Sequence, residues 1–232
     1  MSVHFEHSLE ELKQRLLTMA SKAATAVDHA VKALVNRDDD LARQVIEGDS
    51  ELDDFEVEID ELGVSLLSKA PLASDLRLIT VAMKFAQNLE RVGDEATTIA
   101  RRSLELSQEP QLKPYVDIPR MAHLALDMLN DALDAFVRHD PAKALAVVPR
   151  DKQVDAINKQ LHRELASFMI EKPTTITRCL NLMVISKALE RIADHAKNLG
   201  EEVVYLYEGR DVRHKVNNVP APAAPSPPPP TA

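Results

Sequence analysis

Two copies of a Leu-Glu-Arg-x-x-Asp block, at residues 89–94 and 189–194, lie in long segments whose apolar residues recur with helical spacing. Residues four apart in an α-helix project from the same face, so Glu90 and Asp94 form one carboxylate pair and Glu190 and Asp194 form another. The recurrence of the block at the same place in two similar segments predicts a duplicated helical unit with an acid pair in each copy.

Both glutamates interrupt apolar stripes. The stripes consist of Leu76, Ile79, Met83 and Ala86 before Glu90, and of Ile176, Cys179, Met183 and Ser186 before Glu190. A second stripe covers another side of each helix, so we expect both glutamates to be largely buried. A buried carboxylate needs a cation, a hydrogen-bond donor or a proton, because desolvating it alone costs several kcal/mol. The adjacent Arg91 and Arg191 should point about 100° away. An internal ion pair with another Lys or Arg and a bound metal ion both remain open.

The helix that precedes each block adds further acids. Asp49 and Asp53 begin a row that continues with Glu56 and Asp60, and Asp151 and Asp155 stand in the corresponding segment of the second half. A solvated face explains such a row by itself. Alternatively, four carboxylates from two antiparallel helices make an all-oxygen site in each half, and such sites suit hard cations such as Mg²⁺, Mn²⁺ or iron.

The composition favours an all-helical protein, because the 232 residues include only five glycines and no tryptophan. We expect the first helix to begin at a capping box formed by Ser8 and Glu11 and to end near Asn36. A second helix follows Asp38, and a third, capped by Ser74, runs to about Ser107. The second half repeats this order with an interruption at Pro149, and its last helix ends near Glu208. The predicted domains are residues 1–110 and 111–214, followed by a Pro-rich, disordered tail at 215–232.

Several functional classes are disfavoured. The formal charge of −9 argues against nucleic acid as a ligand. The single cysteine, Cys179, rules out an internal disulfide and suits a reducing cytoplasm. We find no signal peptide and no membrane span, so contact with a membrane would require a partner. A zinc site is disfavoured because the sequence has no Cys and His clusters. We also find no phosphate-binding loop and no nucleophile motif. His195 is either a group that supports a metal ligand or a surface histidine.

The chain resembles the PhoU family of phosphate-uptake regulators. The fragments that carry the resemblance are Leu12-Lys13, Leu17-Thr18-Met19, Asp40-Leu41-Ala42 with Val45-Ile46 and Asp49, residues 71–77, both Leu-Glu-Arg blocks, Asp194-His195-Ala196 and residues 203–209. Their order and duplication make the set specific over about residues 5–214.

The resemblance implies two tandem, pseudo-symmetric three-helix bundles in one elongated six-helix protein that assembles as a homodimer. It also implies metal clusters on paired acid motifs. Carried onto this sequence, the metal ligands are Asp49, Asp53, Glu90 and Asp94 in one site, and Asp151, Asp155, Glu190 and Asp194 in the other. The second half lacks a counterpart of Asp75-Leu76-Arg77, so the two sites can differ in affinity or nuclearity.

The implied role is that of a cytoplasmic, non-enzymatic adaptor. Such a protein couples the ATPase subunit of the phosphate ABC transporter to the phosphate-sensing histidine kinase and represses the phosphate regulon. One alternative is a carboxylate-bridged di-metal oxidase or metal-storage bundle, although neither Glu90 nor Glu190 is followed by the Glu-x-x-His histidine of such enzymes. Another is a structural bundle whose acids are merely solvated.

Overall fold

The computed structural model describes residues 3–69 and 72–213, and this part of the chain contains helices and no strand. The helices of the first half are α1 (Val3–Asn36), α2 (Asp39–Glu47), α3 (Asp49–Leu67) and α4 (Ala73–Ser107). Those of the second half are α5 (Asp117–Arg138), α6 (Pro141–Val147), α7 (Asp151–Glu171) and α8 (Ile176–Glu208), with 3₁₀ turns η1 (Val148–Arg150) and η2 (Pro173–Thr175). The prediction of an all-α fold built from two similar halves is confirmed. The predicted tail at 215–232 lies outside the described residues.

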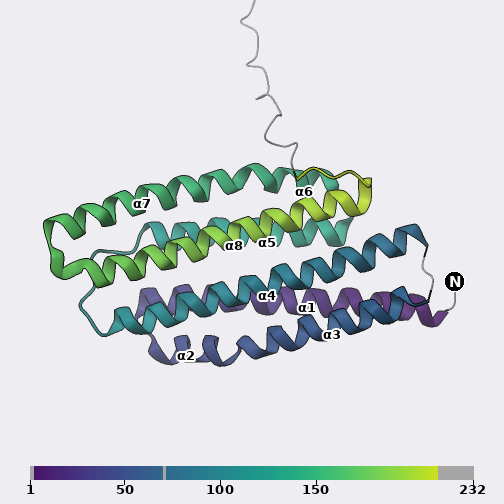
Figure 1. The fold of residues 1–232 in the computed structure, drawn as a ribbon, viewed down its shortest axis with the longest axis horizontal. Coiled ribbons are helices and arrows are strands. Elements are labelled where there is room, and N and C mark those ends of the chain that lie inside the picture. The colour runs from purple at the N-terminus through teal and green to yellow at the C-terminus, as the bar shows by residue number, and fades with distance from the viewer. Residues whose placement is uncertain (1–2, 70–71, 214–232) are drawn as a thin grey trace, which may run out of the picture.

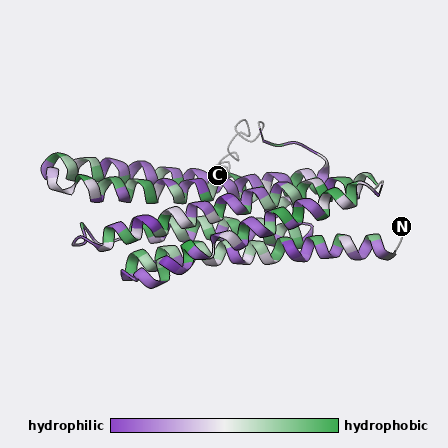
Figure 2. Ribbon diagram, turned by 60° about the horizontal axis from the view of Figure 1, so that its bottom comes forward, coloured by the Kyte–Doolittle hydropathy of each residue, from purple (hydrophilic) through white to green (hydrophobic). Residues whose placement is uncertain are grey.

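The helices run along one long axis in two layers (Figure 1). Helices α1–α4 form one layer and α5–α8 the other, and α4 packs against α8 between them. Apolar and polar residues alternate around each helix with a helical period (Figure 2). Apolar residues from both halves meet in one continuous core, so each amphipathic helix buries its apolar face against its neighbours.

Three predicted helix boundaries were wrong. Helix α1 begins at Val3, and the Ser8 hydroxyl lies inside it, donating a 3.1 Å hydrogen bond to the carbonyl of His4 rather than capping a terminus. Leu72, without a side-chain cap, precedes α4, so Ser74 is not the N-cap. The helix expected after Asp38 is divided at Gly48 into α2 and α3. Gly48 lies between α2 and α3 in the first half, as the predicted interruption at Pro149 lies between α6 and α7 in the second.

The loops between the first two helices of each half also repeat. Arg37 and His139 are the described non-glycine residues with positive φ, at 56° and 57°. Each is followed by an aspartate N-cap: Asp38 accepts from the amide of Leu41 at 3.0 Å, and Asp140 accepts from the amide of Lys143 at 2.9 Å. A left-handed residue ends one helix and a carboxylate starts the next in both halves. The duplication therefore extends to local backbone geometry.

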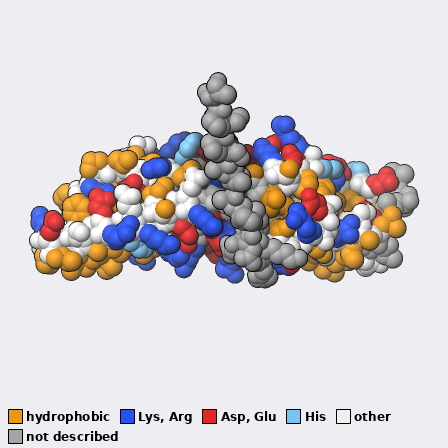
Figure 3. Space-filling view, turned by 90° about the horizontal axis from the view of Figure 1, so that it is seen from above, with side chains coloured by type: hydrophobic (Ala, Val, Ile, Leu, Met, Phe, Trp, Pro, Cys, Tyr) orange, Lys and Arg blue, Asp and Glu red, His pale blue; other side chains and the backbone are white. Residues whose placement is uncertain are grey.

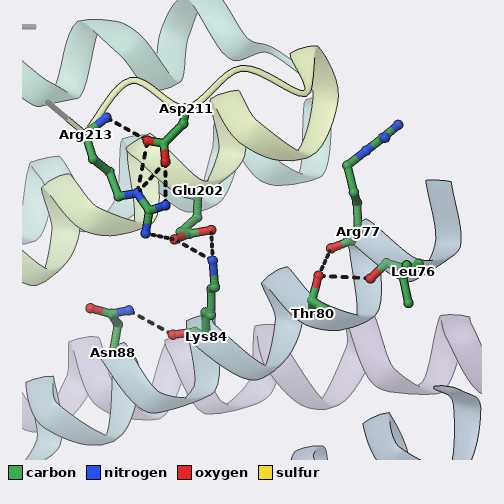
Figure 4. A network of polar contacts seen from close by, with 8 residues as sticks. All are labelled: Leu76, Arg77, Thr80, Lys84, Asn88, Glu202, Asp211 and Arg213. Atoms are coloured by element: carbon green, nitrogen blue, oxygen red, sulfur yellow. Dashed lines mark hydrogen bonds and ion pairs between the residues drawn. The ribbon is translucent and has the colours of Figure 1, made fainter. Parts of the chain in front are cut away.

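Helices α4 and α8 are antiparallel. Three polar pairs join them: Lys84 with Glu202, Asn88 with His195, and Glu95 with Arg191. As the residue number rises along α4 it falls along α8, which fixes the direction of the packing. In Figure 4 the Lys84 side chain points at Glu202, and Arg213, which follows α8, approaches the same carboxylate. These contacts bring the Leu-Glu-Arg blocks of the two halves to the centre of the molecule.

Helices α3 and α4 approach each other closely at Gly93. A Cβ atom at this position would lie 2.3 Å from Leu52 Cδ1, which is much closer than atoms can approach. The equivalent pair in the second half is Ala193 on α8 and Val154 on α7, both buried. The first half pairs the smaller Gly93 with the larger Leu52, and the second half pairs Ala193 with Val154.

We expect Gly93→Ala to lower the free energy of unfolding by about 1–3 kcal/mol, because Leu52 must move out of a packed position. The double variant Gly93→Ala/Leu52→Val copies the second half and should recover most of that loss. Chemical denaturation of the two single variants and the double variant measures the coupling. Additive losses in the double variant would show that the two packing arrangements are not interchangeable.

Candidate metal centre

The first-half acids lie on two neighbouring helices. Asp49 and Asp53 are on α3, and Glu90 and Asp94 are on α4, where the absence of a side chain at Gly93 lets the helices approach. Burial raises the pKa of Asp49, as do the charges of Asp94 and Asp53, while Thr97 acts in the opposite direction. Asp49 on α3 therefore lies close enough to Asp94 on α4 for the two carboxylates to repel each other.

Glu90 lies close to Asp94 and to Glu56 of α3. Its side chain is 16% exposed, so the stripe correctly predicted a largely buried acid. Burial and the charge of Asp94 raise its pKa to about 7. The Arg91 guanidinium lies 3.4 Å from Glu90 Oε2 and 3.4 Å from Asp94 Oδ2. The expectation that Arg91 points away is therefore wrong, because its long side chain folds back towards its neighbours.

The second-half acids have closer cationic partners. Lys187 forms an ion pair with Glu190, whose side chain is 19% exposed. The Lys197 ammonium lies 3.0 Å from Asp194 on the same helix and 3.6 Å from Asp151 on α7. Burial opposes the charged form of Lys197, yet its hydrogen bond to Asp194 and the charges of both aspartates raise its pKa. In this half the ion-pair interpretation describes the contacts present.

The α7 helix carries fewer acids than α3. Counting from Asp49 and Asp151, the positions of Glu56 and Asp60 on α3 correspond to Asn158 and His162 on α7. Asn158 is buried and accepts a 2.8 Å hydrogen bond from Ser186, and the same hydroxyl lies 3.0 Å from His162 Nε2. This buried polar chain was not predicted from the sequence, although aligning the two halves reveals the substitutions.

Among residues 3–69 and 72–213, no group of three or more His, Cys, Asp or Glu side chains is arranged to hold a metal ion. The carboxylates form two acidic neighbourhoods rather than assembled coordination shells. The first-half donors nevertheless fit a hard cation chemically, since they are all oxygen and mutually repelling. Asp94 is 46% exposed, so its carboxylate is accessible to an ion from solvent, although Arg91 contacts it.

A cavity of about 230 Å³ lies beside α1 and has one of the four first-half acids, Asp49, in its lining. Asp49, Gly93 and Thr97 line its inner wall, and Lys22 and His29 of α1 line another. Asp49 therefore lies near Asp94 and also lines this cavity. His29 was not among the predicted site residues, because its relation to Asp49 depends on packing between helices far apart in the sequence.

The other candidate residues have structural contacts. His195 is partly buried and lies with Nδ1 2.9 Å from Asn88 Oδ1, so it links α8 to α4. His195 is therefore not the solvated surface histidine that was one of the two expectations. Cys179 is free and buried, as expected for a small apolar residue of the core.

The raised pKa of Glu90 predicts a pH-dependent stability in the presence of a chelator. Between its usual value of 4.5 and about 7, the folded state keeps a proton that the unfolded state has lost. Stability should therefore fall as the pH rises through this interval. Glu90→Gln should remove the dependence and gain about 1–2 kcal/mol over the unsubstituted chain at pH 8, with little difference at pH 4. The full shift corresponds to about 3 kcal/mol, which partial solvation reduces.

Thermal unfolding of both proteins from pH 4 to pH 8 measures this effect. Exposed Glu105→Gln on the same helix is the control for loss of one negative charge. Parallel pH profiles for the unsubstituted and Glu90→Gln chains would contradict the assignment.

Over the described ranges, no helix is long and apolar enough to cross a lipid bilayer. The face over α7 carries Lys and Arg side chains intermingled with Asp and Glu side chains (Figure 3). This mixture differs from the single basic face typical of nucleic-acid binding.

The fold and site define a class of protein: an all-helical chain of two tandem, pseudo-symmetric bundles with acids on the facing helices of each. The PhoU domain family model matches it twice, at residues 16–103 and 118–203. The chain therefore belongs to the PhoU family.

Similar proteins match over most of the chain. A Pseudomonas putida protein named phosphate-specific transport system accessory protein PhoU homolog is 43% identical over 92% of this chain and 84% of its own length. The Escherichia coli protein of that name, without "homolog", is 36% identical over 92% of this chain and 89% of its own.

Two solved structures share the fold. The crystal structure of PhoU from Pseudomonas aeruginosa has a TM-score of 0.86 and 41% identity, and it covers 89% of this chain and all of its own. The phosphate transport system regulatory protein PhoU from Streptococcus pneumoniae has a TM-score of 0.84 and 32% identity over 90% of this chain and 99% of its own.

Proposed function

We propose that this chain is a non-catalytic accessory protein that regulates a phosphate transport system. The observation that carries the proposal is the similarity, over both bundles, to relatives named as accessory or regulatory proteins of phosphate transport. The chain covers 84% and 89% of the two curated relatives, so the comparison concerns whole proteins rather than one shared module.

The proposal extends to partners and place of action. The protein acts in the cytoplasm, as a homodimer, on the ATPase subunit of the phosphate ABC transporter and on the phosphate-sensing histidine kinase. When phosphate is plentiful, it keeps the kinase from activating its response regulator. Helices α4 and α8 hold both Leu-Glu-Arg blocks at the interface between the two layers. A change at either acid group can therefore influence the packing of both halves.

The proposal also assigns a hard cation, such as Mn²⁺, Mg²⁺ or iron, to the first-half acids Asp49, Asp53, Glu90 and Asp94. Support comes from the mutual repulsion of these carboxylates and from the raised pKa of Glu90. A bound cation would offset the repulsion and hold α3 and α4 in a fixed relation. In this account the ion organises a surface for partners and takes no part in turnover.

Deletion of the gene in its own host, with phosphate in excess, tests the regulatory role. We expect a phosphate-starvation reporter to be switched on, and the unsubstituted chain supplied in trans to repress it again. Affinity purification of the tagged chain at high and low phosphate should recover the transporter ATPase and the kinase. A reporter unaffected by deletion, together with recovery of neither partner, would contradict the proposal.

A further inference from the structure

The two halves place different residues at one position beside the acids. The Leu-Glu-Arg blocks are 100 residues apart, so Thr97 on α4 corresponds to Lys197 on α8. Thr97 is buried, with 3% exposure, and a hydrogen bond from its side chain lowers the pKa of Asp49, against the effect of burial. Lys197 extends its ammonium to Asp151, which is the counterpart of Asp49. A neutral hydroxyl in one half is thus replaced by a positive charge in the other.

The Lys197 ammonium bridges the two helices that a metal ion would join. It lies 3.0 Å from Asp194 Oδ1 on α8 and 3.6 Å from Asp151 Oδ2 on α7. A cation bound by these same two carboxylates would have to share their oxygens with the ammonium and would be repelled by it. The second-half acids are therefore already bridged by a cation that belongs to the chain.

The charge around each acid group supports this asymmetry. In the first half, Glu56 adds to the four predicted ligands, and Arg91, 58% exposed, contacts two of these acids. In the second half, the neutral Asn158 replaces Glu56, while Lys187 and Lys197 contact the acids. Two lysine ammonium groups therefore contact the second-half acids, and Glu201 adds a negative charge near Lys197. In the first half one exposed arginine, Arg91, contacts the acids, and the charge of Arg101 also acts on Asp49.

We propose that Lys197 serves as a built-in counter-cation for the second-half acids, so that the first half binds a metal ion and the second half does not. This inference rests on the proposed metal binding of the first half and specifies which of the duplicated sites is used. The second bundle then keeps its α7–α8 geometry whatever the metal supply. The ion then acts directly on the α3–α4 geometry only, and any effect on the second half passes through the packing of α4 on α8.

Equilibrium dialysis of chelator-treated protein against Mn²⁺ tests the inference. Compared with the unsubstituted chain, the variant Asp49→Asn/Glu90→Gln should lose most of its Mn²⁺ uptake. The matched variant Asp151→Asn/Glu190→Gln should take up as much Mn²⁺ as the unsubstituted chain. Lys197→Thr, which copies the first half, should about double the uptake. The added part should disappear in Lys197→Thr/Asp151→Asn/Glu190→Gln.

A stability measurement guards against variants that merely unfold. Without metal, Lys197→Thr should melt several degrees below the unsubstituted chain, because Asp151 and Asp194 lose their bridging cation; Mn²⁺ should restore the melting temperature. Equal losses of Mn²⁺ uptake in the two matched double variants, or folded Lys197→Thr with no added uptake, would overturn the inference. Absence of Mn²⁺ from the unsubstituted chain would instead overturn the metal binding on which it rests.

Discussion

Replacing Phe85 by alanine is expected to lower the free energy of unfolding by about 3–5 kcal/mol. Phe85 on α4 is fully buried, and its ring centroid lies 5.2 Å from that of Phe136 on α5. The pair therefore joins the first half to the second. Truncation removes a large apolar side chain from a core that cannot close around the gap.

Chemical denaturation measures the loss, with Phe55→Ala on α3 as the control. Phe55 is only partly buried, so its truncation should cost clearly less. Phe136→Ala and the double variant with Phe85→Ala complete a cycle whose coupling energy reports the contact between halves. Equal losses for Phe85→Ala and Phe55→Ala would contradict the view that the two bundles share one core.

Saturating Mn²⁺ is expected to stabilise the metal-free protein by about 3 kcal/mol when its concentration is a hundred times the Kd. For a chain of this size, that corresponds to a rise in melting temperature of roughly 5–10 °C. The gain arises because the folded state alone brings Asp49 and Asp53 of α3 to Glu90 and Asp94 of α4. Repulsion that the metal-free fold must bear is then offset by the ion.

Differential scanning calorimetry with and without Mn²⁺ measures this stabilisation. Asp49→Asn/Glu90→Gln should lose it, although the same variant should be more stable than the unsubstituted chain without metal, because a buried repulsion is gone. Asp28→Asn/Asp127→Asn, which removes two acids on α1 and α5, controls for net charge. An equal Mn²⁺ effect in both variants would indicate non-specific binding.

Periodicity predicted the parts of the fold that depend on local sequence. It correctly identified the helical class, the duplication and the partial burial of Glu90 and Glu190, because a stripe reports which side of a helix faces neighbours. The same stripes overstated burial at their first members: Leu76 and Ile176 are 45% and 42% exposed. Leu76 lies near the start of α4 and Ile176 is the first residue of α8, and fewer neighbouring helices cover these ends.

Side-chain reach could not be predicted in the same way. The spacing of residues along a helix gives the direction of each Cβ atom. The charges of Arg91 and Lys197 lie several bonds beyond Cβ, so these side chains can bend towards nearby carboxylates. Lys197 reaches Asp151 on another helix, so its effect requires the packing of α7 on α8. The sequence predicted that the two sites can differ, because the second half lacks a counterpart of Asp75-Leu76-Arg77, but the effect of Lys197 on the second-half acids was missed.

The most direct test of the account is a crystal structure of the chelator-treated protein soaked in Mn²⁺, with anomalous scattering used to locate the metal. We expect an anomalous peak between α3 and α4, within coordinating distance of Asp49 and Glu90 carboxylate oxygens, and none beside Lys197. A peak between α7 and α8 alone, or first-half acids without metal at saturating Mn²⁺, would contradict it.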